Sequence, residues 1–294
     1  NSGIYCFCGR RLSENIDKID NNNVQGEYYL TDMVGIYRQI GEPVSALLAE
    51  DDSELLGVNS RVQLAQVTKI MQRRINESLM AAGVTMLDPS MVWVGPEVTV
   101  GQDTELLPMT MLWGKTSVGN DCVIGPNTRL TDVTVGDGSS VEETVGYQTV
   151  IDEDVTVGPR AYLRPGTHLC DRAHVGTHVE IKNSTIGEGS KVPHLSYIGD
   201  TTMGSGVNIG AGSITCNYDG VNKHRTTIGD GVFIGSDTMM VAPVSIGDGA
   251  LVGASSCITT DVPADALSLE RSEQRIVEGY AKMRREALQR RKDR

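Results

Sequence analysis

From Val94 to about Pro263 the chain repeats a six-residue unit in which an aliphatic residue is most often followed by glycine. A repeat of this length is typical of parallel β-helices, in which each unit is one short strand that buries its apolar side chain only by stacking on neighbouring coils. The aliphatic positions are Val94, Val100, Leu106, Leu112, Val118, Ile124, Leu130, Ile181, Val192, Ile198, Ile209, Ile228, Ile234, Met240, Ile246, Val252 and Ile258. The sequence therefore predicts a mainly β protein built around a β-helix.

The residues around each aliphatic position predict how one coil is built. Side chains alternate along a strand, so the residue four places later should also point inward, as at Val98, Thr104 and Cys122. The glycine suits a tight corner, where a positive φ or a close approach of another backbone excludes a Cβ. Three units per coil, with coils spaced roughly 4.8 Å apart, predict about nine coils. A narrow aliphatic interior also agrees with an aromatic content of only 4%.

The remainder of the chain divides into three regions. Residues 1–58 have a mixed α/β pattern, with strand-like segments at 3–7 and 44–49 and a helical segment at 30–40. Residues 59–83 carry an apolar stripe with helical spacing and end at Gly83, which predicts a linker helix. The β-helix is expected over residues 84–270 and a basic tail over 271–294. The linker helix and the tail are each expected to cover one end of the β-helix.

Charge and cysteine content restrict the class of protein. The formal net charge is -12, although residues 271–294 alone hold nine Lys or Arg against four Asp or Glu. The body is therefore acidic, and it has no basic stripe with interleaved aromatic residues, which argues against a nucleic-acid partner. Six cysteines without a C-x-x-C pair and the lack of a long apolar run argue against a disulfide framework and a membrane span, so a cytoplasmic location is expected.

One segment interrupts the repeat. Residues 215–227 fit no six-residue frame and include Cys216-Asn217-Tyr218-Asp219-Gly220. Extra residues in a solenoid are ejected as a loop on one face, and such loops often bind ligands. The segment is therefore predicted to be an active-site loop.

Several motifs resemble one known family. They are NSGIY at 1–5, NNNVQGEYYLTD at 21–32, GVNSR at 57–61, LRPG at 163–166, HLSY at 194–197, and NIGAG at 208–212 followed by Asn217-Tyr218. With these motifs the chain resembles the bifunctional bacterial enzyme N-acetylglucosamine-1-phosphate uridylyltransferase / glucosamine-1-phosphate N-acetyltransferase. The resemblance implies a left-handed parallel β-helix, an exception to the right-handed crossover rule, and a homotrimer with acetyltransferase sites between subunits.

The same resemblance implies that the chain begins near the end of an α/β uridylyltransferase domain. The preceding part of that domain would carry the Gly-rich nucleotide loop and a metal-binding Asp, so uridylyl transfer is expected to be absent here. In the intact enzyme, that activity would use Mg²⁺ and UTP to form UDP-N-acetylglucosamine for peptidoglycan and lipopolysaccharide precursors. By the match, Asn1, Thr31 and Asn59 belong to the nucleotide-sugar side, with Asn59 as a magnesium ligand. In this chain we expect Asn59 instead to be the N-cap of the linker helix.

The acetyltransferase implied by the resemblance moves acetyl from acetyl-CoA to the amine of glucosamine-1-phosphate. The amine must lose a proton, and His194 matches the general base. An anionic sugar phosphate needs cationic and hydrogen-bonding partners. The matching residues are Arg164, Lys182, Tyr197, Asn208 and Lys223.

Acetyl-CoA needs a channel and hydrogen-bond donors to the thioester oxygen. By the match, the acetyl-CoA residues are Ala211, Asn217, Tyr218, Ser236, Ala254 and Arg271. The backbone amide of Ala211 and the hydroxyl of Ser236 are the expected oxyanion donors, and Asn217 is expected to orient the amine or His194. Glu270 stands where the family tends to have a small residue, which weakens the expected attraction of Arg271 for a CoA phosphate.

Two other functions remain open from the sequence. The chain could be a catalytically silent trimerising scaffold, which would not consume acetyl-CoA. It could also be a zinc-dependent hexapeptide-repeat lyase, because His174 and His178 lie four residues apart and similar trimers resembling γ-class carbonic anhydrases bind zinc through three histidines. That chemistry leaves Arg164, Lys182 and the Asn217-Tyr218 loop without a role.

Overall fold

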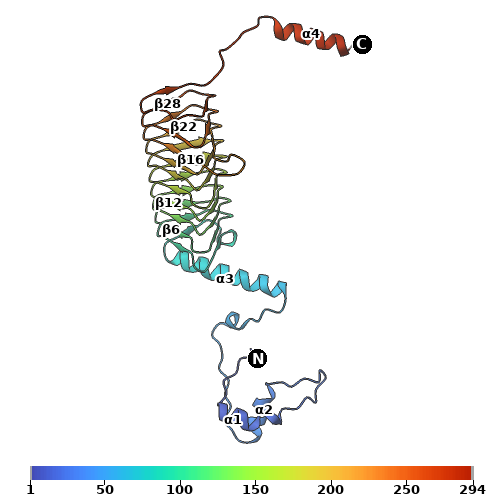
Figure 1. Ribbon diagram of the computed structural model, residues 1–294. Coiled ribbons are helices and arrows are strands. Elements are labelled where there is room, and N and C mark those ends of the chain that lie inside the picture. Colours follow the sequence, from blue (N-terminus) through green and yellow to red (C-terminus); the bar gives the residue numbers. More distant parts are fainter. Residues whose placement is uncertain (1, 293–294) are drawn as a thin grey trace. The chain divides into compact units, whose positions relative to one another are not determined.

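The computed structural model describes residues 2–292 and contains two compact units, one ending at Met71 and one beginning at Gln72. The second unit is a parallel β-helix whose short strands stack into three sheets, here called the first, second and third faces (Figure 1). Within the described residues, none of the helices combines the length and the apolar character that a membrane crossing requires.

The chain visits the three faces in turn, so a strand pairs with the strand three later in sequence, except that β28 pairs with β30. The first face consists of β1 (Thr85–Met86), β4 (Glu105–Leu106), β7 (Val123–Ile124), β10 (Ser140–Val141), β13 (Thr156–Val157), β16 (His174–Thr177), β19 (Lys191–His194), β22 (Asn208–Ile209), β25 (Phe233–Ile234), β28 (Leu251–Val252) and β30 (Leu267–Ser268).

The second face consists of β2 (Trp93–Val94), β5 (Met111–Trp113), β8 (Arg129–Thr131), β11 (Val145–Tyr147), β14 (Tyr162–Leu163), β17 (Glu180–Lys182), β20 (Tyr197–Gly199), β23 (Ile214–Cys216), β26 (Met239–Val241) and β29 (Cys257–Ile258). The third face consists of β3 (Thr99–Val100), β6 (Ser117–Val118), β9 (Thr134–Val135), β12 (Val150–Ile151), β15 (His168–Leu169), β18 (Thr185–Ile186), β21 (Thr201–Met203), β24 (Thr226–Ile228) and β27 (Val244–Ile246). The described chain thus forms about ten coils, one more than predicted.

The interior of the β-helix is the core that the repeat predicts. All the aliphatic positions of the unit are buried except Val100, which is half-buried against the same core. The residues four places later, including Val98, Thr104 and Cys122, are buried as expected. Where this residue is Thr, its hydroxyl forms hydrogen bonds with backbone groups of the next coil: Thr104 Oγ1 donates to the Gly119 carbonyl at 2.8 Å and accepts from the Cys122 amide at 3.0 Å.

The corners use glycine for both predicted reasons. A Cβ built on Gly101 would lie 2.5 Å from the carbonyl carbon of Gly119, so close approach excludes a side chain there. Gly125 instead has a positive φ of 112°. Other positive-φ positions of the repeat are often occupied by Asp or Asn, such as Asp103 and Asn127. These residues tolerate the left-handed conformation because their short polar side chains bond locally.

The part of the linker helix α3 (Arg61–Ala81) from Gln72 onward covers the first coil, as predicted. Ile75 and Leu79 pack against the core, and the short helix η3 (Pro89–Met91) lies at the contact. The closest contact is nevertheless polar, because the buried amides of Gln72 and Asn76 donate to the Val92 carbonyl at 2.5 and 2.9 Å. These amides satisfy carbonyl groups of the first coil.

The first unit is helical in its regular structure. It contains α1 (Gly9–Asn15), η1 (Ile16–Lys18), α2 (Asp32–Gln39) and η2 (Asp52–Leu55). Helix α2 confirms the helix predicted at 30–40. The strands predicted at 3–7 and 44–49 were wrong, because both segments are irregular in the described chain. A short apolar pattern alone does not fix a strand, which also needs the backbone hydrogen bonds of a sheet.

The tail does not cover the last coil. Helix α4 (Tyr280–Lys292) has no buried residue, and every described residue from Arg271 onward is exposed. The prediction that the tail caps the β-helix was therefore wrong. The physical reason lies in its sequence, YAKMRREALQRRK, which offers few apolar side chains for burial.

Candidate active site

Four of the predicted residues stack along the edge between the first and second faces. We call His194, Ala211, Ser236 and Ala254 the edge column. The carbonyl of each accepts a hydrogen bond from the coil that follows. The His194 carbonyl accepts from Gly212 N at 3.3 Å and the Ala211 carbonyl from Asp237 N at 2.7 Å. The Ser236 carbonyl accepts from Ser255 N at 2.8 Å and the Ala254 carbonyl from Arg271 Nη1 at 3.4 Å. With coils spaced about 4.8 Å apart, the edge column spans roughly 14 Å. His194 is exposed at one end of it and Arg271 lies at the other.

A second group of predicted residues lies on the second face. Arg164 directly follows β14, Lys182 ends β17, and Lys223 reaches the group from the inserted loop. We call these three residues the cationic cluster. Arg164 donates to Glu180 at 2.8 Å, and this hydrogen bond raises the pKa of Arg164.

Lys182 and Lys223 lie next to each other, and their pKa values move in opposite directions. Hydrogen bonding with Lys223, together with the charge of Asp200, raises the pKa of Lys182 against the effect of its burial. The hydrogen bond and positive charge of Lys182 lower the pKa of Lys223. Two adjacent ammonium groups repel each other, so an anion bound between them would be favourable to both.

Asp200 organises this part of the second face, and the sequence did not single it out. Its buried carboxylate accepts from Asn183 at 2.6 Å and from Asn217 at 2.5 Å, and it lies 3.5 Å from Lys182 Nζ. Burial would raise the pKa of Asp200, but the hydrogen bonds from the two asparagines and the charge of Lys182 outweigh it and lower the pKa. Asp200 therefore holds Lys182 and Asn217 in place as an anion.

The predicted loop is shorter than the segment outside the repeat frame. Residues 215–216 belong to β23 and 226–227 to β24, so the loop covers 217–225 and projects from the stack of coils (Figure 1). Asp219 braces it by accepting from the amides of Val221 and Asn222 and from His224 Nε2 at 2.7 Å. The isolated bridge between Tyr218 and Lys223 places Lys223 on the returning arm of the loop.

The edge column and the second-face group meet on a single coil. His194 ends β19 and Tyr197 begins β20, with only Leu195 and Ser196 between them. Ser196 is buried, and its hydroxyl donates to the His194 carbonyl at 2.8 Å. Tyr197 contacts Asn217, whose amide lies 3.5 Å from the phenol oxygen. A ligand bound at the cationic cluster on the second face would therefore lie one corner of the β-helix away from His194.

Not every predicted residue lies with its expected partners. Asn208 is paired with Lys191 at the start of β19 on the first face, whereas His194 ends that strand. Asn217 lies with Asp200 and Tyr197 on the second face rather than along the edge column. Tyr218 is exposed in the loop, where its hydroxyl donates to the Gly220 carbonyl at 2.6 Å.

The contacts at the end of the edge column show how the chain accommodates Glu270, which stands where the family tends to have a small residue. The Glu270 carboxylate accepts from the Cys257 amide at 3.2 Å, and the Glu270 amide donates to Ser256. The carboxylate is thus held by the backbone while Arg271 contacts the Ala254 carbonyl. Arg271 itself is exposed.

The nucleotide-sugar residues form no site in the described chain. Asn1 lies outside the described residues, and Thr31 and Asn59 are exposed in the first unit. The N-cap expected at Asn59 is wrong by one position: Ser60 Oγ accepts from the Gln63 amide, while the Gln63 side chain accepts from the Asn59 amide. A Mg²⁺ site needs carboxylate ligands, and within residues 2–292 no group of three potential ligands includes a neighbour of Asn59. The residues present therefore do not fit magnesium.

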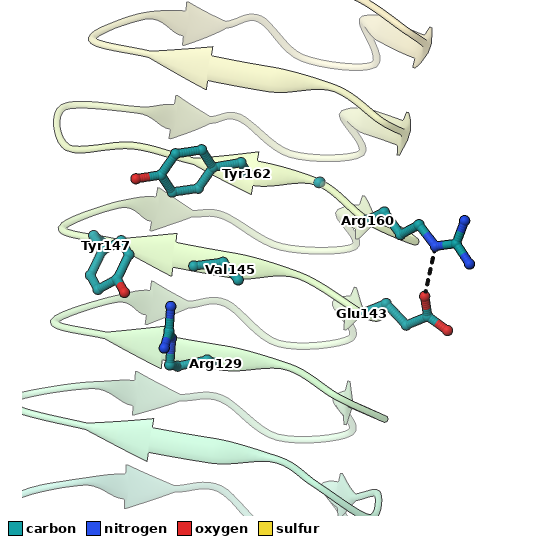
Figure 2. Close-up of a pocket in the computed structure, with 7 residues that line it drawn as sticks. Arg129, Glu143, Val145, Tyr147, Arg160 and Tyr162 are labelled. Atoms are coloured by element: carbon teal, nitrogen blue, oxygen red, sulfur yellow. Dashed lines mark hydrogen bonds and ion pairs between the residues drawn. The ribbon is translucent and has the colours of Figure 1, made fainter.

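A shallow pocket of about 430 Å³ continues the second face away from Arg164. Figure 2 shows Arg129, Tyr147 and Tyr162 on three successive strands of this face. The Arg129 guanidinium carbon lies 5.7 Å from the Tyr147 ring centroid, and that of Arg164 lies 6.0 Å from the Tyr162 ring centroid. The tyrosines meet edge to face at 6.4 Å. The hexapeptide frame marks these positions as outward-facing but did not single them out as a group.

The two histidines considered for zinc do not form a cluster in the described chain. His174 Nδ1 is hydrogen-bonded to Thr156 Oγ1 at 2.6 Å, and burial lowers the pKa of His174. His178 is an exposed corner residue. The one group of three potential metal ligands found within residues 2–292 contains neither of them.

Comparison with known proteins matches the repeat and nearly the whole chain. Residues 225–260 match the family described as bacterial transferase hexapeptide (six repeats), and residues 115–142 and 148–179 match the hexapeptide repeat of succinyl-transferase. These matches support the left-handed hexapeptide-repeat β-helix expected from the sequence.

Three relatives, each named Bifunctional protein GlmU, illustrate the similarity. The protein of Carboxydothermus hydrogenoformans is 52% identical over 96% of this chain and 63% of its own length. That of Heliobacterium modesticaldum is 51% identical over 95% of this chain and 61% of its own, and that of Fervidobacterium nodosum is 50% identical over 98% and 63%. The chain thus spans somewhat less than two thirds of the length of these relatives.

Proposed function

The chain is a homologue of the bifunctional GlmU proteins over nearly all of its own length, and on that premise we propose that its β-helix is a glucosamine-1-phosphate N-acetyltransferase. Acetyl-CoA would donate the acetyl group, and the products would be N-acetylglucosamine-1-phosphate and CoA. The observation that carries the proposal is that a single corner separates His194 of the edge column from Tyr197, whose strand β20 pairs with the strand that ends at Lys182.

The sugar phosphate would bind on the second face. The cationic cluster supplies three positive groups, and Lys182 and Lys223 in particular repel each other until an anion separates them. Arg164 presents a planar guanidinium, which suits phosphate oxygens. Tyr197 would hydrogen-bond the sugar and orient its amine towards the corner that carries His194.

His194 would act as the general base. The sugar ammonium would first lose one proton to solvent. His194 would then remove a proton from the amine as its nitrogen lone pair forms the new C–N bond to the thioester carbonyl. The resulting tetrahedral intermediate collapses with cleavage of the C–S bond. The CoA thiolate leaves and takes up a proton, for which protonated His194 is the nearest source, so the base is regenerated.

The rest of the edge column would hold acetyl-CoA. The carbonyl oxygen becomes negative in the intermediate, and donors at the Ala211 backbone and the Ser236 hydroxyl would stabilise it. Ala254 leaves room for the chain of the cofactor, and Arg271 would contact a phosphate beyond it. Asn217 and Tyr218, which also match acetyl-CoA positions, would approach the cofactor from the loop.

A homotrimer would complete the site. On the first face, Phe233, Leu251 and Leu267 are 49%, 45% and 61% exposed and lie in register with Asn208 on neighbouring strands. An exposed apolar stripe of this kind is suited to burial against another copy of the chain in a closed ring. Such a contact would bring Asn208 of one subunit to the sugar-phosphate group of its neighbour, which the single chain does not achieve.

For the intact protein we extend the proposal to the second activity in the relatives' name. The longer chain would form UDP-N-acetylglucosamine from UTP with Mg²⁺, using Asn1, Thr31 and Asn59 together with residues outside this chain. The six cysteines are free, which suits a reducing cytoplasm as the place of action.

Replacement of His194 by Ala tests the acetyltransferase. Sugar-dependent release of thiol from acetyl-CoA should fall by at least about 10²-fold, the lower range for loss of a general base, while the oligomer remains intact. The matched control is His178→Asn, an exposed histidine one coil away whose positive φ of 55° asparagine tolerates. That variant should keep normal turnover.

The alternatives predict different results in the same experiment. Near-normal turnover by His194→Ala would remove His194 from the mechanism. A folded trimer of the unmodified chain that releases no thiol in the presence of the sugar would favour a silent scaffold. Carbon dioxide hydration that is lost in His174→Ala and His178→Asn would favour the zinc lyase.

A further inference from the structure

The third face carries three side chains of different ligand types on two neighbouring strands. Asp152 directly follows β12, and His168 and Cys170 flank the inward-pointing Leu169 at the end of β15. The register pairs Val150 with His168 and Ile151 with Leu169, so Asp152 and Cys170 occupy equivalent places on adjacent coils. All three side chains are half-buried on the outer surface of the face.

The donor atoms of these side chains are close together. His168 Nε2 lies 2.7 Å from Asp152 Oδ2, and the Cys170 sulfur completes a set whose atoms all lie within 4.8 Å of one another. Tetrahedral zinc holds N and O ligands at about 2.0–2.2 Å and S at about 2.3 Å, which places neighbouring ligands roughly 3.3 Å apart or slightly more. An ion would thus require side-chain shifts of about 1 Å and no change of the backbone.

We propose that Asp152, His168 and Cys170 form a binding site for a zinc-like divalent cation, with the fourth position open to water. One imidazole nitrogen, one thiolate and one carboxylate are a donor set that favours zinc over magnesium or calcium, which prefer oxygen ligands alone. Binding would release the thiol proton of Cys170 to solvent. His168 would coordinate through Nε2 with its ring proton on Nδ1, so the hydrogen bond between His168 and Asp152 would be replaced by one bond from each side chain to the ion.

The surroundings of this site favour a cation. Asp171 and Glu188 lie close enough to Cys170 to act on it electrostatically, and both add negative charge. The site is also separate from the proposed acetyltransferase, since its strands belong to the third face and the edge column lies between the first and second. An ion here would join two successive coils, β12 to β15, and so would stabilise the folded chain against unfolding.

The molecule contains an internal comparison for this site. His224 Nε2 and Asp219 Oδ2 are also 2.7 Å apart, but in the described chain no third ligand joins them within the same reach. A His–Asp pair alone is an ordinary hydrogen bond. The sulfur of Cys170 is what distinguishes the pair on the third face.

The experiment uses the full chain with Cys6→Ser and Cys8→Ser, which removes two exposed thiols that could bind metal independently. Zinc is titrated by calorimetry, and cobalt is titrated with detection of the thiolate-to-cobalt absorption band. We expect one equivalent of zinc per chain, a cobalt–thiolate band, and a zinc-dependent rise in Tm. Cys170→Ser and His168→Asn should each weaken zinc at least about tenfold, a loss that even supporting residues cause at metal sites.

Two matched controls locate the ion. Cys216→Ser removes another half-buried thiol and His224→Asn removes the other His–Asp pair, and both should keep the parent affinity. Circular dichroism checks that each variant is folded. The proposal is overturned if the parent binds no stoichiometric zinc, if binding survives both Cys170→Ser and His168→Asn, or if it is lost in His174→Ala instead.

Discussion

At the scale of single residues, the candidate site depends on charges that constrain one another. The anionic Asp200 fixes Lys182 and Asn217, and Lys182 in turn changes the proton affinity of Lys223. The family resemblance identified the lysines but not Asp200, whose role appears only when Lys182 and Asn183 of one coil and Asn217 of another are brought to it. A lone Asp at a strand end offers no such signal in the sequence.

The lowered pKa of Lys223 predicts a pH dependence of substrate binding. Lys223 is a cation below its pKa and loses its charge as the pH rises through it, at a lower pH than an ordinary lysine. The sugar phosphate is already a dianion there, because its second pKa is about 6. The KM for the sugar phosphate should therefore rise severalfold on the alkaline side, measured from pH 8 to 10, roughly the range below the usual lysine value.

Lys223→Arg should remove this rise, because a guanidinium stays charged across the range. Lys191→Arg, a change of an exposed lysine on the first face, should leave the rise as it is in the unmodified chain. Identical pH profiles for the unmodified chain and Lys223→Arg would mean that Lys223 does not contact the phosphate.

At the scale of elements, a coil is held by its inward hydroxyls as well as by its aliphatic residues. The strands have only two to four residues, and buried carbonyls at the corners need hydrogen-bond donors. Inward hydroxyls supply some of them, as Thr104 does for Gly119 and Thr110 for Ile124. The sequence predicted that Thr104 and its equivalents point inward. It did not indicate that Thr104 bridges two backbone groups of the next coil, because that depends on the register between coils.

Replacement of Thr104 by Val tests this role. The shape is nearly kept, but the Gly119 carbonyl and the Cys122 amide both lose a buried partner. The free energy of unfolding should fall by about 1–3 kcal/mol, the usual cost of unsatisfied buried polar groups, measured by urea denaturation. Thr99→Val, on the outer surface of β3, should change it by less than about 0.5 kcal/mol. Equal effects of the two changes would contradict the bridge.

At the scale of the whole molecule, the β-helix is stabilised by its own coils and by the polar contact with α3, and the tail adds nothing to its core. The repeat and the tail were both clear in the sequence. Only the structure showed that Gln72 and Asn76 of α3 cover one end, whereas the tail is exposed throughout residues 271–292.

Truncation after Ser272 should therefore leave the protein stable. The removed residues include all of α4, and those up to Lys292 have no buried side chain, while Arg271 is retained. We expect a change of less than about 0.5 kcal/mol in the free energy of unfolding and unchanged thiol release. A substantially lower Tm or a loss of the oligomer in the truncated chain would show that the tail has a structural partner.

The sequence alone determined the β-helix, the position of the inserted loop and, through motifs, the identity of the residues proposed for the site. It could do so because a six-residue period with buried aliphatic positions has few structural solutions. The tertiary structure decided which of those residues stack: His194, Ala211, Ser236 and Ala254 along one edge, Arg164 and Lys182 on the second face, and Asn208 apart from both. The set of Asp152, His168 and Cys170 also arises only from stacking, because residues 16 and 18 apart in sequence become neighbours when the coil length sets the register.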